Sequence, residues 1–268
     1  MRLGVTVMCS LRVVDADDRH FRYVSLCTHV DSDSPDQVKA AERRLGWLKE
    51  QIREGRMAVK VAINGDGKPV GFMHLIPIEF PTSGLVGRDL MVIPCLTSER
   101  APKERGTGVG RVLVEAAEQE ARSKGLKGLA VHAYDGDFWF MPSGFFERLG
   151  FRRVGDSEIW VKRWAETDVP FLRPSRYSYV PVLGKVVIDY FWSPFCLTVC
   201  QEVESIRQVA EEFGDGIMLR EYRADDPDVA ARYGMGRALF INGERRDWGY
   251  AAPKEELRRV VGSKLSTS

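Results

Sequence analysis

Apolar and polar positions along the first 164 residues predict a mixed α/β unit. Apolar runs typical of strands lie at residues 5–14, 57–63, 69–80, 89–97 and 126–134, and residues 152–164 predict a strand pair or one bent strand. Residues 34–55 predict a capped helix, because apolar side chains recur there at helical spacing: Val38, Ala41, Leu45, Leu48 and Ile52. A long helix after the glycines at 106–110 and a short one within 142–151 complete the pattern.

The pattern changes between residues 165 and 184, where three prolines and no periodicity predict a linker. After it, residues 185–268 follow the order β-α-β-α-β-α, enough for a small domain. The predicted organisation is therefore a domain at 1–164, a linker at 165–184 and a second domain at 185–268.

Composition excludes several classes of partner. The 268 residues are 44% apolar and 29% charged, with a net charge of +1, so no charge excess drives the chain onto nucleic acid or a membrane. No apolar run approaches the roughly 18 residues of a membrane-spanning helix. Five cysteines, an odd number, argue against a secreted disulfide framework, and a cytoplasmic location is predicted.

The stretch from Arg105 to Arg111, RGTGVGR, has the chemistry of a phosphate-binding loop. Glycines let the backbone approach a ligand closely, and the helix behind them adds unpaired N–H groups and the positive end of its dipole. The Gly-Lys-Ser/Thr ending of a nucleotide P-loop and the G-x-G-x-x-G spacing of dinucleotide-binding folds are both missing.

This segment fits the Arg/Gln-x-x-Gly-x-Gly/Ala signature of the GNAT N-acetyltransferases, after the fourth strand as in that family, and FFERLGF at 145–151 resembles the family's closing helix. The resemblance covers about residues 1–164 and implies a mixed twisted sheet with flanking helices. It also implies acetyl-CoA as cofactor and direct attack by an acceptor amine of a small molecule or peptide. The residues implied in cofactor binding are Leu96, Thr97, Arg105, Gly106, Thr107, Gly108, Val109, Gly110 and Arg111, with the pantetheine arm beside the end of the fourth strand.

The chain departs from the family at Phe146, where a tyrosine often proposed to protonate the leaving thiolate would stand. Phenylalanine donates no proton, but a thiolate with a pKa near ~8.5 leaves without help. Tyr134 is a substitute candidate, although a tyrosine at a strand end is more often a packing residue.

The attacking amine must lose a proton, and carboxylates and histidines in the predicted strands are candidate bases. Glu79 is a catalytic candidate beside His74 and His132, although each is more often structural. Asp135 and Asp137 lie where acceptors enter in this family, and an Asp-Gly turn is the alternative reading.

The second domain opens with a strand, aromatic residues, Cys196 and then Cys200 on a predicted helix. A helix N-terminus stabilises a thiolate, and this pattern resembles the thioredoxin fold with one residue more between the cysteines. The family's cis-proline is replaced near Gly236 or Arg237. Disulfide chemistry, thiol or metal sensing, a specificity module and two inert cysteines all remain open, and we assign no metal site.

A GNAT unit fused to a smaller thioredoxin-like α/β unit resembles the YoaP-like group of acetyltransferases. The leading prediction is an N-acetyltransferase using acetyl-CoA. The alternatives are a thiol-disulfide oxidoreductase or thiol sensor that uses Cys196 and Cys200 with CoA as regulator, and a non-catalytic CoA-binding module. The acceptor and the oligomeric state stay open.

Overall fold

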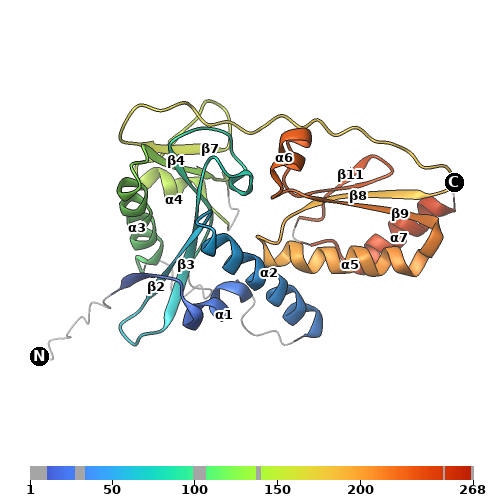
Figure 1. Ribbon diagram of the computed structural model, residues 1–268, viewed down its shortest axis with the longest axis horizontal. Coiled ribbons are helices and arrows are strands. Elements are labelled where there is room, and N and C mark those ends of the chain that lie inside the picture. The colour runs from blue at the N-terminus through green and yellow to red at the C-terminus, as the bar shows by residue number, and fades with distance from the viewer. Residues whose placement is uncertain (1–10, 28–33, 99–106, 137–139, 250, 267–268) are drawn as a thin grey trace, which may run out of the picture. The chain divides into compact units, whose positions relative to one another are not determined.

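A computed structural model describes residues 11–27, 34–98, 107–136, 140–249 and 251–266. Contacts divide the chain into two compact units (Figure 1). One contains Met1–Thr28, Ile52–Glu79 and Gly87–Phe171, and the other contains His29–Gln51, Phe80–Val86 and Leu172–Ser268. The predicted boundaries at 164 and 184 follow chain order, so the grouping of residues 29–51 with the C-terminal part is a difference that only tertiary contacts reveal.

The first unit is built on a seven-stranded mixed sheet with the order β1-β2-β3-β4-β5-β7-β6. Neighbouring strands are antiparallel except β4 and β5, which are parallel. The strands are β1 (Arg12–Asp15), β2 (Ala58–Ile63), β3 (Pro69–Pro77), β4 (Leu90–Ser98), β5 (Gly128–His132), β6 (Arg152–Arg153) and β7 (Ile159–Arg163). The predicted mixed sheet is confirmed, and residues 152–164 form the strand pair. Residues 5–10 of the predicted first strand lie outside the described residues.

Helices cover both faces of this sheet. The helices α3 (Val109–Ser123) and α4 (Ser143–Arg148) share one apolar core with alternate strand residues such as Met73 and Leu75. Phe72, which directly precedes Met73 in β3, points to the other face and meets Tyr23 of α1 (Asp18–Leu26), with ring centroids 5.8 Å apart. The sequence pattern did not predict α1, whose N-cap Asp17 is part of a capping box with a histidine in place of the usual glutamate.

Helix α2 (Pro35–Arg53) has the predicted type and length, and Ala41 and Leu48 of the predicted apolar stripe are buried, but the buried face also includes polar residues that the stripe left out. Val38 is 43% exposed, whereas Gln37, Arg44 and Gln51 are buried. The buried polar residues lie seven positions apart, on one helix face, and Arg44 Nε donates a hydrogen bond to the Phe195 carbonyl at 2.8 Å. Tertiary hydrogen bonds to the C-terminal part of the second unit therefore select the buried face of α2.

The second unit carries a four-stranded sheet with the order β11-β10-β8-β9. Its strands are β8 (Val186–Trp192), β9 (Ile217–Arg223), β10 (Ala238–Ile241) and β11 (Glu244–Arg246), and only β8 and β9 are parallel. The sequence pattern missed β11. Asn242 and Gly243 form its two-residue hairpin loop, with φ of 49° and 78°, which is the turn chemistry that Asn-Gly favours.

Different helices cover the two faces of this second sheet. The long helices α5 (Leu197–Phe213) and α7 (Lys254–Leu265) share an aliphatic core with one face, and the short α6 (Pro227–Tyr233) packs with an aromatic cluster on the other (Figure 1). Short 3-10 turns lie at η1 (Pro81–Ser83) and η3 (Gly214–Gly216). Among the described helices, none is both long enough and apolar enough to traverse a bilayer.

Candidate functional site

Strands β4 and β5 pair along only the first half of β4, and the sheet of the first unit is open beyond that point. The two strands pair as far as Ile93 of β4 and Val131 of β5, and β4 then runs on to Ser98 beside β3. At the parting, Ile93 and Pro94 oppose the single Leu75 of β3, which makes a β-bulge in β4. A bulge bends its strand and increases its twist. Among the described strands, the last part of β4 therefore has a free backbone edge where β5 would otherwise continue.

Leu96 and Thr97, predicted to lie beside the pantetheine arm, are in this part of β4 past the bulge. Leu96 is partly buried against the core that α3 covers, and Thr97 is buried and pairs with Phe72 of β3. The predicted neighbours of the pantetheine are thus on the strand that opens, next to the start of α3.

Helix α3 begins directly after Gly108, its N-cap, which has a φ of 86°. This left-handed conformation carries no steric penalty for glycine. The Val112 N–H donates to the Gly108 carbonyl at 3.1 Å, so the amides of the turn before it have no partner within the helix. No acidic residue lies in the first turn, and Thr107 and Arg111 are exposed. Two predicted members of this loop lie outside the described residues: Arg105 and Gly106.

Two further glycines let neighbouring elements approach this helix start closely. A Cβ added at Gly71 of β3 would lie 2.6 Å from Val109 Cγ1 and 2.8 Å from the Thr97 carbonyl oxygen. A Cβ at Gly110 would lie 2.9 Å from Phe145 Cζ of α4. All three distances are shorter than those of real Cβ contacts. Glycine at position 71 therefore lets α3 lie against β3 and β4, and glycine at position 110 lets α3 lie against α4.

Tyr134 follows β5, and its backbone closes a loop. Its N–H donates to the Met141 carbonyl at 3.0 Å and its carbonyl accepts from the Ser143 N–H at 2.8 Å. Burial, and the nearby negative charge of Glu158, raise the pKa of the Tyr134 hydroxyl above its usual range. The tyrosine thus keeps its proton at neutral pH.

Asp135 does not present a free carboxylate to an incoming amine. It accepts hydrogen bonds from Arg153 and, at 2.7 Å, from Ser143 Oγ, and the Arg153 bond is the main cause that holds the pKa of this carboxyl below its usual range. Asp135 therefore stabilises the start of the loop after β5 through its hydrogen bonds, which agrees with the alternative interpretation of this segment as an Asp-Gly turn. Asp137 lies outside the described residues.

The remaining predicted acid–base candidates are spread over the sheet. Glu79 lies past the end of β3 and accepts a hydrogen bond from the Asp89 N–H at 2.9 Å, at the amino end of β4, opposite the end that opens. His74 is fully buried in β3, with its ring 5.4 Å from that of Phe72. His132, by contrast, lies at the opening and meets Glu158, a residue that the sequence pattern did not single out. Phe146, at the position of the missing tyrosine, is a core residue only 1% exposed.

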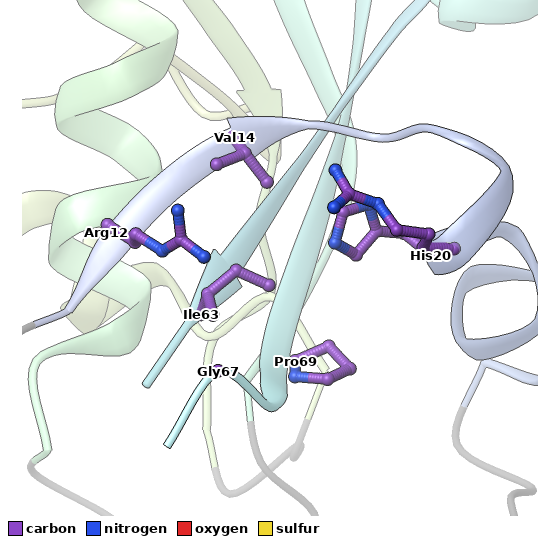
Figure 2. Close-up of a pocket in the computed structure, with 7 residues that line it drawn as sticks. Arg12, Val14, His20, Ile63, Gly67 and Pro69 are labelled. Carbon is purple, nitrogen blue, oxygen red and sulfur yellow. The ribbon is translucent and has the colours of Figure 1, made fainter. Parts of the chain in front are cut away.

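A separate hollow of about 210 Å³ lies at the edge of the first unit's sheet. Figure 2 shows its lining, with side chains from β1, the start of α1 and both sides of the β2–β3 turn. It is lined by Arg12, Val14, Arg19, His20, Ile63, Gly67 and Pro69. None of the predicted site residues lines it, and two of its three basic side chains, Arg19 and His20, are already paired with Asp17.

In the second unit, Cys196 is the N-cap of α5 and is partly exposed, whereas Cys200 is fully buried. Burial raises the pKa of the Cys200 thiol to about 12. Arg237 lies close enough to Cys196 to interact with it electrostatically. Two hydrogen bonds of 2.8 and 2.9 Å to the buried Glu202 hold the Arg237 guanidinium in place.

Glu202 is a fully bonded buried carboxylate. Besides the two hydrogen bonds from Arg237, it accepts one from Tyr190 at 2.5 Å and one from the Ala252 N–H at 2.9 Å. Because every oxygen has donors, the charge is tolerated at 3% exposure. Arg237, one of the two residues near which the sequence analysis placed the missing cis-proline, thus lies near Cys196.

Comparison with known protein families finds one match. Residues 26–151 match the model of the acetyltransferase (GNAT) family. This match confirms the prediction that this part of the chain is an acetyltransferase, and it does not extend to residues 152–268. No curated protein sequence matches the chain significantly.

Several solved structures are similar in outline. The GNAT N-acetyltransferase YhbS from Escherichia coli, in complex with CoA, is 15% identical, covers 62% of this chain and 86% of its own, and has a TM-score of 0.41. A GNAT acetyltransferase from Brucella melitensis, in complex with acetyl-CoA, is 14% identical over 60% of this chain and 92% of its own, with a TM-score of 0.40. Spermidine/spermine N-acetyltransferase SpeG from Vibrio cholerae is 15% identical over 57% of this chain and 89% of its own, with a TM-score of 0.37.

Proposed function

We propose that the chain is an N-acetyltransferase that moves an acetyl group from acetyl-CoA directly to an amine of a small molecule or peptide. One observation carries the proposal: α3 begins at a left-handed glycine immediately beside a bulged β4 that parts from β5. The family match over residues 26–151 supports it.

In this proposal the diphosphate of acetyl-CoA binds the amides of Gly106–Gly110, with Arg105 and Arg111 adding positive charge. The pantetheine arm pairs with the free edge of β4 beside Leu96 and Thr97, as an added strand would. A backbone N–H of this strand stabilises the oxyanion that forms when the amine attacks the thioester. The chemistry of this donor set, amides with cations and no carboxylate in the first turn, suits an anionic group.

Tyr134 is the proposed donor to the leaving thiolate. Its raised pKa keeps the hydroxyl protonated, so it can donate a hydrogen bond to the sulfur as the C–S bond breaks. Because a free thiol has a lower pKa, about 8.5, complete transfer of the tyrosine proton is uphill, and Tyr134 recovers its proton from the acceptor amine. Glu79 is not part of the site we propose, because it lies at the amino end of β4 while the sheet opens at the carboxyl end.

Calorimetric titration with acetyl-CoA tests the proposed diphosphate site before α3. Valine at Gly108 would be forced into a left-handed conformation and would crowd the diphosphate, so Gly108→Val is expected to weaken binding at least about tenfold. The matched control is Gly67→Val, a glycine of similar φ and equally open surroundings in the β2–β3 turn, which should leave binding unchanged. The proposal is overturned if the wild-type protein gives no heat with millimolar acetyl-CoA, or if Gly108→Val binds it as well as the control.

The second unit is a thioredoxin-like domain in this proposal. Its parallel β8–α5–β9 unit, followed by the antiparallel β10–β11 hairpin and α7, gives a strand order that supports this reading. A second candidate function follows from the position of Cys196, half-exposed at the start of α5 beside an arginine: reversible dithiol–disulfide chemistry with Cys200. The predicted cytoplasmic location stays a prediction.

Mass spectrometry of the intact chain tests the second candidate. Diamide would take two hydrogens and two electrons from Cys196 and Cys200, which lowers the mass by two hydrogens and joins the two sulfurs. A reductant would restore the mass, and Cys196→Ser would prevent the loss. A chain whose mass does not change with diamide, or whose Cys196→Ser variant loses the same two hydrogens, contradicts this candidate.

A further inference from the structure

A histidine–carboxylate pair stands at the point where β4 and β5 part. His132 is the last residue of β5, one position after the final pair between the two strands, and Nε2 lies 2.8 Å from Glu158 Oε2. Glu158 directly precedes β7, and its carbonyl accepts a hydrogen bond from the Ala133 N–H at 2.9 Å. Backbone pairing therefore fixes both members of the pair next to the opening.

Val131 and Ala133 belong to the core under α3, so His132 between them points to the other face of the sheet. The ring centroid of Tyr134 is 4.9 Å from that of His132. The two side chains of the pair are 35% and 54% exposed, so water and a soluble amine reach them.

We propose that His132 accepts the proton that the acceptor ammonium must lose before it attacks, and that Glu158 positions its ring. This inference rests on the proposed acetyl transfer and adds the base to it. With Nε2–H donating to Glu158, Nδ1 is the basic atom, and among the described residues Nδ1 has no hydrogen-bond partner. Glu158 also stabilises the imidazolium that forms.

The step balances without any further reactant. The ammonium gives one proton to Nδ1, and the freed nitrogen lone pair forms the C–N bond to the thioester carbon. As the C–S bond breaks, the sulfur leaves as thiolate and receives the second amine proton, through Tyr134 or directly. The products are the amide, the CoA thiol and one proton, which the exposed His132 passes to water.

The other described candidate bases near the opening are less accessible to an acceptor amine. Asp135 is occupied by Arg153 and Ser143, and His74 is buried in the sheet. The titratable and charged groups around the pair are Tyr134 and Arg153, which both interact electrostatically with Glu158, and Arg153 interacts in turn with Asp135 and Asp156.

The test measures CoA thiol release from acetyl-CoA with spermidine and with a lysine peptide as probe amines, between about pH 6 and 9. His132→Gln should lower kcat/KM about 10²–10⁴-fold near neutral pH, the usual contribution of a general base. The deficit should shrink as pH rises, because alkyl amines with a pKa near ~10 then supply more neutral amine. Glu158→Gln should lower kcat less and alter the same limb of the pH profile, as expected of a positioning residue.

His20→Gln is the matched control, because His20 and Asp17 form the other histidine–carboxylate pair of this unit, at 2.8 Å and away from the opening. It should keep the wild-type pH profile. Acetyl-CoA affinity, measured by calorimetry, should be the same in all variants. An unchanged pH profile in His132→Gln overturns the inference while leaving the acetyl transfer standing. Transfer to neither probe by the wild-type protein overturns the proposed function, and the inference with it.

Discussion

Gly71 is the position where a single methyl group should separate β3 from the start of α3. In Gly71→Ala the new Cβ would lie 2.6 Å from Val109 Cγ1 and 2.8 Å from the Thr97 carbonyl oxygen. The first contact is relieved only by moving α3, since Val109 is 2% exposed and packed in the core. The second involves backbone, so it is relieved only by moving β4 past its bulge.

Overpacking of this kind costs about 1–3 kcal/mol. Replacing a glycine also restricts the unfolded chain, which returns about 0.4–1 kcal/mol. The expected net destabilisation of the first unit is about 1–2 kcal/mol, or a fall in Tm of roughly 2–8 °C for a unit of this size. Acetyl-CoA affinity should fall as well, because the two elements that move are α3, whose start is the proposed diphosphate site, and β4, the strand proposed to pair with the pantetheine arm.

Thermal unfolding followed by circular dichroism, with calorimetric titration of acetyl-CoA, measures both effects. The control is Gly144→Ala in α4 of the same unit, where the nearest atom to a new Cβ is the end of the flexible Arg148 side chain at 3.6 Å. Alanine there should be neutral or stabilising by up to about 1 kcal/mol. A Gly71→Ala protein with unchanged Tm and unchanged affinity would refute the close approach of β3 to α3.

Three further predictions concern the second unit. Glu202→Gln should destabilise it by about 1–3 kcal/mol in urea unfolding, because the Arg237 guanidinium loses its buried counter-charge; equal stability would contradict the network. The hydrogen bond from Arg258 lowers the pKa of Glu212 from 4.5 to about 2, so its stabilisation is present above pH 4.5 and is lost as pH falls toward 2. Glu212→Gln should therefore flatten the plot of Tm against pH in that window, and an unaltered slope would show that the ion pair does not form. Iodoacetamide at mildly alkaline pH should alkylate Cys196 and spare Cys200, as peptide mapping would reveal, and equal labelling would contradict the burial that raises the pKa of Cys200 to about 12.

Element types followed from sequence wherever the local pattern and the packing agree. Strands β2 and β8, for example, are almost fully buried, so their apolar runs predict them. Helix α1 was missed because it buries only three residues, two of them polar, and leaves almost no apolar period to read. The histidine that completes its capping box is also outside the usual signature.

Part of the candidate site could likewise be predicted from the sequence, and part could not. The glycine segment before α3 could be read from the sequence, because glycine at alternate positions before a helix has a local conformational cause. Glu158 could not be found so, because its role depends on the β5–β7 pairing that brings it beside His132 from 26 residues away. Its one local signal is a charged residue directly before an apolar run.

Apart from α1 and β11, the sequence by itself determined the order of strands and helices. It also determined the α/β class and the glycine turn that opens α3, since each follows from periodicity and backbone sterics within a few residues. Tertiary structure alone decided where β4 leaves β5, which face of α2 is buried and which acids meet which bases. Those outcomes depend on hydrogen bonds and contacts between residues far apart in the chain. Arg44, for example, is buried on α2 because the Phe195 carbonyl accepts a hydrogen bond from a guanidinium that local hydrophobicity would have left in water.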